Sequence, residues 1–272
     1  LSPTRQWKLY LLVLTIILFI TIIFSLNLGF SPVPIPNIFK IFINHLPVVK
    51  DFINFSVPEL ETTIITQVRL PRIFCAAIVG AALAVAGAVY QGIFRNPMAD
   101  PYTIGASSGA AVGATVSIVL GASVTFLGIN SIPVFAFIGC LATVLFVYSI
   151  SKVGSKVPVH TLLLSGIAVS IILSAVVSYL QTIAPEKLHQ SQFWLMGSFS
   201  YSEWTEILTV LPLVLIGIGF IYFYARDLNL LALGEEEAQN LGVNLEKVKK
   251  VMLISSALIT AAAVSISGLI AF

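Results

Sequence analysis

Long apolar runs alternate with short polar segments along most of this chain. The apolar runs lie near residues 9–30, 71–93, 103–126, 132–150, 158–183, 206–225 and 251–272. A helix needs roughly 20 mostly apolar residues to cross the hydrocarbon core of a bilayer. The pattern therefore predicts an all-α, polytopic membrane helix bundle with about seven spans.

The composition agrees with a membrane setting. Hydrophobic residues make up 58% of the chain, charged residues 10%, and the mean hydropathy is +1.01. The net charge of +2 is too small to indicate a nucleic-acid partner, and no basic cluster is interleaved with exposed aromatic residues. We expect an integral membrane protein that contacts the lipid bilayer and no nucleic acid.

The basic residues favour one orientation in the membrane. With the N-terminus in the cytoplasm, alternate crossings place nine of the 14 Lys and Arg residues inside and five outside. The nine are Arg5, Lys8, Arg95, Lys152, Lys156, Arg226, Lys247, Lys249 and Lys250. This distribution predicts a cytoplasmic N-terminus. Arg69 and Arg72 are exceptions, because they lie beside a span on the disfavoured side.

Residues 227–250, called segment 227–250 below, are a compact polar stretch between the last two apolar runs. The acids Glu235–Glu237 suit the positive end of a helix, and Gly242 suits the position just past its end. Asn244 can cap a second helix that leads into the next span. The segment therefore predicts a helix, a glycine turn and a second helix.

Segment 227–250 also offers a surface to a soluble partner. Ala238 and Leu241 would form its apolar contact, and the neighbouring acids would keep the segment soluble and oriented. The segment stands out because only 10% of the residues in this chain are charged.

Small residues recur at every fourth position in two predicted spans. These rows are Gly105, Gly109, Gly113, Ser117 and Gly121 in one span and Gly80, Ala84 and Ala88 in the span before it. Small residues let helices approach closely in membranes. Both rows predict a densely packed bundle.

A third row with this spacing, in the run 158–183, consists mostly of hydroxyl residues. Its members are Gly166, Ser170, Ser174, Ser178 and Thr182. The hydroxyls could line a water-accessible path, or they could bond to the backbone of their own helix. The spacing alone leaves both alternatives open.

Charged residues are missing from the interior of the predicted spans. All 12 acids and 14 basic residues can be placed in loops or at span ends, whereas ion-coupled carriers usually need a buried ionisable residue. The three histidines are too far apart in sequence to indicate a metal site. No phosphate-binding loop, His-Glu-x-x-His motif or G-x-S-x-G motif is present. We expect a chain that is not an enzyme and draws energy from a partner.

An ordered series of motifs resembles the FecCD permease family, the membrane subunits of type II ABC importers. The first members are Arg69-Leu-Pro-Arg72, Gly80–Gly92 and Asn96–Pro101. The series continues through Gly105–Gly109, Leu164–Gly166, Trp194–Gly197, Gly234–Gly242 and Ser267–Phe272. Each motif alone is weak, but their order in a polytopic chain is specific.

The resemblance implies a transport subunit of the cell membrane that imports a metal chelate by alternating access. The chelate would be a ferric siderophore, haem or cobalamin, with the siderophore the commonest in the family. The implied partners are a second copy of the permease, two cytoplasmic ABC ATPases and an extracytoplasmic binding protein. ATP and Mg would bind to the ATPases, and this subunit would hold neither a cofactor nor a metal.

The resemblance also implies roles for particular residues. The coupling helices that contact the ATPase match Gly234, Glu235, Glu236, Ala238, Leu241, Gly242 and Val243. The translocation pathway would include Ser165, Gly166, Ser170, Ser174 and Ser178. Arg69 and Arg72 match arginines that dock the binding protein in the cobalamin member, while the alternative is that they anchor a span at lipid headgroups.

The chain departs from the family in length. It stops at Phe272 within an apolar run, whereas the family continues to about ten spans. We therefore expect residues 1–272 to be a single permease domain truncated at its C-terminus. The main alternative function is a carrier or channel driven by an ion gradient, with segment 227–250 as a solvated loop.

Overall fold

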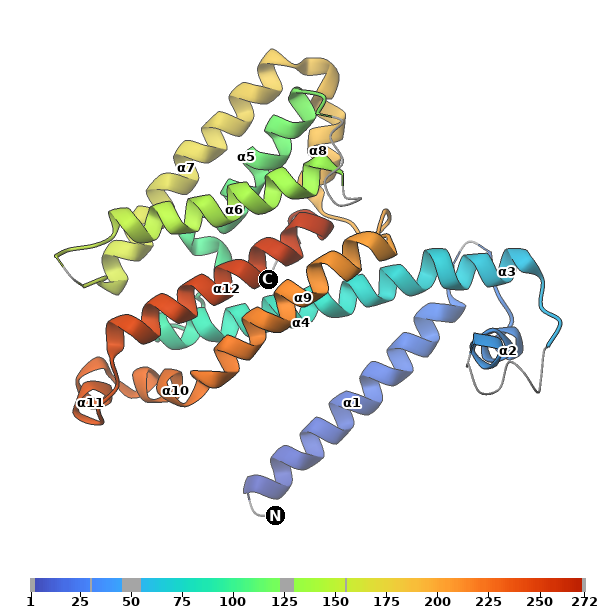
Figure 1. Ribbon diagram of the computed structural model, residues 1–272, viewed down its shortest axis with the longest axis horizontal. Helices are drawn as coiled ribbons and strands as arrows, with labels where there is room; N and C mark the ends of the chain where they lie inside the picture. The colour runs from blue at the N-terminus through green and yellow to red at the C-terminus, as the bar shows by residue number, and fades with distance from the viewer. Residues whose placement is uncertain (1–2, 30, 46–54, 123–129, 155, 271–272) are drawn as a thin grey trace. The chain divides into compact units, whose positions relative to one another are not determined.

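The computed structural model describes residues 3–29, 31–45, 55–122, 130–154 and 156–270. These residues form helices joined by turns and loops, as the sequence predicts, and the described part contains no extended strand (Figure 1). Two compact units divide the chain at Phe74 and Cys75, and each is described by itself. The single domain over residues 1–272 stays a prediction.

The first unit contains a long apolar helix and several short ones. They are α1 (Pro3–Asn27), α2 (Ile35–His45), α3 (Glu59–Thr63) and the π-helical turn η1 (Ile64–Arg69). A small core of Leu26, Val33, Ile38, Ile41 and Ile65 holds the end of α1 against α2 and η1. Most of the surface of α1 is exposed, which suits a helix in lipid.

Arg69 closes the C-terminal end of α1. Arg69 is only 8% exposed, and its guanidinium donates hydrogen bonds to the carbonyl oxygens of Leu26, Asn27 and Ser31. The last carbonyls of a helix have no partner within the helix and carry partial negative charge. The sequence predicted exposed charges at Arg69 and Arg72. That is wrong for Arg69, which is buried because it satisfies these carbonyls, whereas Arg72 is exposed.

Replacing Arg69 with methionine is expected to destabilise the protein by about 2 kcal/mol or more, because hydrogen bonds from a charged donor to buried carbonyls are lost. The melting temperature of the purified protein in detergent should fall by roughly 5 °C. Lys8→Met removes a positive charge from an exposed position of α1 and should melt near the native temperature. Equal melting of the two variants would contradict the capping role.

The second unit is a bundle of longer helices, and α4 (Leu70–Phe94) spans the boundary into it. Its other elements are η2 (Pro101–Ile104), α5 (Ala106–Val119), α6 (Ser131–Ile150), α7 (Val159–Ile183), η3 (Pro185–Lys187), α8 (Leu188–Met196), α9 (Trp204–Phe223), α10 (Ala225–Leu233), α11 (Glu235–Asn240) and α12 (Leu245–Ser267). The most buried of the candidate spans is α12, which packs between α6 and α9 (Figure 1).

Six helices in the described residues are long and apolar enough to cross a membrane. They correspond to six of the seven predicted spans. The remaining one, 103–126, is shorter as a helix, because α5 begins only at Ala106 and ends at Val119. Asp100 caps the short helix η2, and Gly105, with φ of 87°, separates η2 from α5. The predicted end of this span, 123–126, lies outside the described residues.

Gly109 and Gly113 in the first row of small residues pack as predicted, whereas Gly121 is exposed and a Cβ there would meet no atom within 4 Å. A Cβ atom added to Gly109 would overlap the carbonyl oxygen of Gly139, and one added to Gly113 would overlap that of Phe135. The backbones of α5 and α6 are therefore in direct contact. The second row differs from its prediction, because Gly80, Ala84 and Ala88 are exposed and a Cβ on Gly80 would have no atom within 4 Å.

Two of the motifs in the sequence series meet in space. A Cβ on Gly197 would lie 2.6 Å from the carbonyl oxygen of Leu269, and one on Gly268 would lie 2.9 Å from the Cα of Gly197. The amide of Ser198 donates to the carbonyl of Ser267 at 2.8 Å. The turn after α8 is thereby held against the end of α12.

Candidate functional site

From Glu235 onward, segment 227–250 forms the predicted helix, glycine turn and helix at one end of the second unit, and α10 precedes them as a short helix that the sequence did not predict (Figure 1). After α11, Gly242 has φ of 84°, a conformation that glycine adopts readily. The amide of Gly242 donates to the carbonyl of Gln239 at 2.9 Å, and the amide of Val243 donates to that of Ala238 at 3.0 Å. These paired bonds are typical of a glycine-terminated helix.

Asn244 begins α12 as predicted. Its side-chain oxygen accepts a hydrogen bond from the amide of Lys247 at 3.1 Å. A side-chain cap of this kind satisfies one of the free amides in the first turn of a helix. The glycine terminator and the asparagine cap together fix how α11 leads into α12.

The apolar surface of the segment differs from its prediction. Ala238 has no exposed surface, so it packs inside the chain and cannot contact a partner. Leu241 is 64% exposed, and Leu233, at the end of α10, is 72% exposed. The exposed apolar pair is therefore Leu233 and Leu241, one before and one after α11. The sequence did not single out Leu233.

A groove of about 340 Å³ adjoins Leu241. It lies between α10 and the turn that joins α11 to α12, and its lining includes Arg226, Asp227, Gly242 and Lys247. Leu241 and this groove form an uneven surface with apolar and charged parts. Such a surface can receive a complementary partner.

The acids at the start of α11 have different environments. Glu236 and Glu237 are exposed, as expected for residues that keep the segment soluble. Glu235 is partly buried, and its Oε1 lies 2.9 Å from the Nζ of Lys249. Lys249 is only 3% exposed. The sequence analysis had counted it among the cytoplasmic basic residues that predict the orientation of the chain in the membrane.

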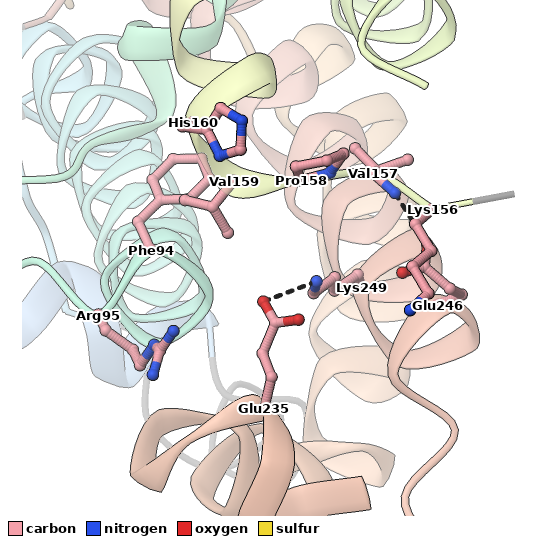
Figure 2. Close-up of a pocket in the computed structure, with 10 residues that line it drawn as sticks. All are labelled: Phe94, Arg95, Lys156, Val157, Pro158, Val159, His160, Glu235, Glu246 and Lys249. Atoms are coloured by element: carbon pink, nitrogen blue, oxygen red, sulfur yellow. Dashed lines mark hydrogen bonds and ion pairs between the residues drawn. The ribbon is translucent and has the colours of Figure 1, made fainter. Parts of the chain in front are cut away.

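This ion pair lies beside a second cavity, of about 330 Å³ (Figure 2). The cavity is lined by residues from the end of α4, from α11, from α12, and from the loop that precedes α7. Those with charged or titratable side chains are Arg95, Lys156, His160, Glu235, Glu246 and Lys249. Three of these residues, Arg95, Lys156 and Lys249, are far apart in the sequence, were assigned to the cytoplasmic side from the crossing pattern, and lie together at one end of the second unit.

The predicted pathway residues on α7 divide into two groups. Gly166 is buried, and a Cβ there would lie 2.6 Å from the Cα of Ile104, so this glycine serves close packing. Ser165 and Ser170 are partly buried. Ser174 and Ser178 are exposed, and the hydroxyl of Ser178 donates to the carbonyl of Ser174 at 3.1 Å. Backbone bonding therefore occurs at Ser178, and a pathway role for the row stays a prediction.

A polar cluster that the sequence analysis missed lies near the other end of α7. The hydroxyl of Ser191 on α8 accepts a hydrogen bond from Gln181 at 2.9 Å and lies 3.3 Å from the hydroxyl of Thr115. Both hydroxyl residues are buried. The cluster ties α8 to α5 and α7. Within the described ranges, no group of three His, Cys, Asp or Glu side chains is placed to hold a metal ion.

Comparisons with known proteins match most of the chain. Residues 17–272 match the model of the FecCD transport family. The cobalamin import system permease protein BtuC of Halobacterium salinarum is 44% identical over 220 residues, which cover 81% of this chain and 58% of that protein. The hemin transport system permease protein HmuU of Yersinia pestis is 40% identical over 225 residues, covering 80% and 66%. The chain therefore spans about two thirds or less of the length of these relatives.

A solved structure has a similar fold. It is described as an inward-facing conformation of a metal-chelate type ABC transporter, and it superposes with a TM-score of 0.79 at 34% sequence identity. The match covers 97% of this chain and 77% of the other. The helix arrangement described above is therefore shared with a transport protein.

Proposed function

Because the chain belongs to the FecCD transport family, we propose that it is the permease subunit of an ATP-driven importer. The observation that carries this proposal is the end of the second unit, where Leu241 is exposed beside a groove and Leu233 is exposed just before α11. An apolar pair in a polar segment is suited to contact with another protein. The subunit itself is a multi-pass membrane protein that performs no catalysis, and the partner would hydrolyse ATP.

This end of the second unit faces the cytoplasm in the proposed orientation. Arg95, Lys156 and Lys249 come from three separate parts of the chain and line one cavity there. Cytoplasmic loops are enriched in Lys and Arg. The gathering of basic residues supports a cytoplasmic position for segment 227–250. With the short helix α5 counted as a further crossing, alternate crossing places the N-terminus on the same side.

The proposed assembly contains two copies of the permease, two cytoplasmic ATPases that bind ATP and Mg, and an extracytoplasmic binding protein. The subunit would have no cofactor or metal of its own. Of the coupling residues that the resemblance implies, Glu236, Leu241 and Gly242 are exposed, and each ATPase would bind this surface together with Leu233. Arg72 stays the exposed candidate for docking the binding protein, while the burial of Arg69 favours its capping role.

The proposed substrate is a metal chelate such as a ferric siderophore, haem or cobalamin. Two relatives carry cobalamin and hemin in their names, and the similar structure is of a metal-chelate type transporter. Charged side chains lie mainly at helix ends in the described spans, which suits a wide path that binds a large ligand weakly. The exposed face of α7 is the candidate lining of that path.

Replacing Ser174 with leucine is expected to slow uptake severalfold, because a larger apolar side chain would narrow a path lined by hydroxyls. Uptake of a radiolabelled chelate by cells measures this effect, and ATPase binding should not change. Ala175→Leu introduces the same side chain at the neighbouring exposed position of α7. If both variants transport at the native rate, the serine hydroxyls only bond to the backbone of α7 and do not line the path.

The proposed function is tested by uptake in cells whose cognate ATPase carries an inactivating substitution in its phosphate-binding loop. We expect uptake of a ferric siderophore, haem or cobalamin to fall to background. Uptake that continues in these cells, and stops when the membrane ion gradient is collapsed, would instead identify a gradient-driven carrier.

A further inference from the structure

The first turns of α12 contact two elements that the sequence separates widely. Glu246 and Lys249 are three residues apart, so they lie on neighbouring positions of one helix face. Both line the cavity of about 330 Å³ shown in Figure 2. Each makes a polar contact across that region to a different part of the chain.

Lys249 connects α12 to α11. Its Nζ lies 2.9 Å from the Oε1 of Glu235, and Figure 2 shows the two side chains pointing toward one another. With 3% of its side chain exposed, Lys249 has little access to water and depends on this carboxylate to balance its charge. The pair therefore resists separation of the two helices.

Glu246 connects α12 to the start of α7. Its Oε2 accepts a hydrogen bond from the amide of Val157 at 3.2 Å. Val157 is buried and lies just before Pro158, the N-cap of α7. A shift of the first turn of α12 would therefore pull directly on the backbone where α7 begins.

Other contacts join α11 to α12 besides the ion pair. Ala238 on α11 is fully buried, and its carbonyl accepts a hydrogen bond from the amide of Val243 at 3.0 Å. These contacts hold α11 to the start of α12, and the ion pair between Glu235 and Lys249 adds a charged link between the two helices.

We propose that Glu235, Lys249 and Glu246 form a polar connector that transmits movement of α11 through α12 to the start of α7. The proposal rests on the proposed function, in which α11 contacts the ATPase and α7 lines the path. Its three residues are positioning residues, because they act through the helices they join and touch neither substrate nor nucleotide.

The test measures the amount of chelate imported per ATP hydrolysed, in proteoliposomes that contain the complete transporter and its binding protein. Glu235→Gln and Lys249→Met should each lower this ratio at least fivefold while the ATPase stays bound and active. Glu246→Ala should act in the same direction. The exchanged pair Glu235→Lys with Lys249→Glu should restore at least half of the native ratio. The exposed neighbour of Lys249 provides a matched control, Lys250→Met, which should keep the native ratio.

Several results would overturn the connector. A native ratio in Glu235→Gln, which alters the less buried partner, would show that the contact transmits nothing. Loss of ATPase binding in that variant would make Glu235 a docking residue instead. A native protein with no ATP-dependent uptake would refute the proposed function, and the connector with it.

Discussion

Replacing Leu233 and Leu241 together with aspartate is expected to abolish co-purification of the cognate ATPase with the permease. Both leucines are largely exposed, on either side of α11. Burying a leucine side chain at an interface contributes about 1.5–3 kcal/mol, and aspartate would place an unpaired charge in the same contact. Binding should weaken by at least a hundredfold. The measurement is recovery of the ATPase with the affinity-tagged permease in detergent.

The control for this experiment adds the same charge without removing apolar surface. Gln239→Asp with Asn240→Asp changes two exposed polar residues of the same segment. This variant should recover the ATPase almost as well as the native protein. Equal recovery in all three proteins would place the ATPase contact elsewhere on the permease. Ala238 is unsuitable for this test, because a charge at a fully buried position would disturb the fold itself.

Replacing Gly109 with alanine is expected to destabilise the second unit, although the change adds only one methyl group. The added methyl group would overlap the carbonyl oxygen of Gly139 and the side chain of Thr143. The backbone of α6 cannot rotate away, so α5 and α6 would have to separate. Overpacking of this kind costs about 1–3 kcal/mol, which corresponds to a melting temperature lower by roughly 3–10 °C.

A second glycine provides the matched control. Gly219 also lies within a long helix, and a Cβ there would meet no atom within 4 Å. Gly219→Ala should be neutral or slightly stabilising, because alanine favours the helix. The melting temperature of each purified variant in detergent measures the difference. If Gly109→Ala and Gly219→Ala had the same melting temperature, the result would contradict direct backbone contact between α5 and α6.

Local signals in the sequence predicted local structure well. The acids of α11, Gly242 and Asn244 each act within one turn of their own position, so their spacing was enough to predict helix, turn and helix. The apolar runs predicted the long helices for the same reason. The row of glycines in α5 predicted close packing, although its partner, α6, emerged only from the structure.

The errors concern contacts between distant parts of the chain. Ala238 was expected on the surface because α11 is polar, but which face of a six-residue helix is buried depends on its neighbours in space. Lys249 was counted as an orienting charge, yet it pairs with Glu235, which lies 14 residues earlier. Arg69 bonds to carbonyls at least 38 residues earlier. Periodicity carries no information about such pairs.

The most direct test of the central claim is uptake by proteoliposomes that contain the permease, its ATPase and the binding protein loaded with a metal chelate. The proposed importer should accumulate the chelate only when ATP is present on the side that carries segment 227–250, and a non-hydrolysable ATP analogue should not support accumulation. Accumulation without ATP, driven by an imposed ion gradient, would contradict an ATP-driven import function.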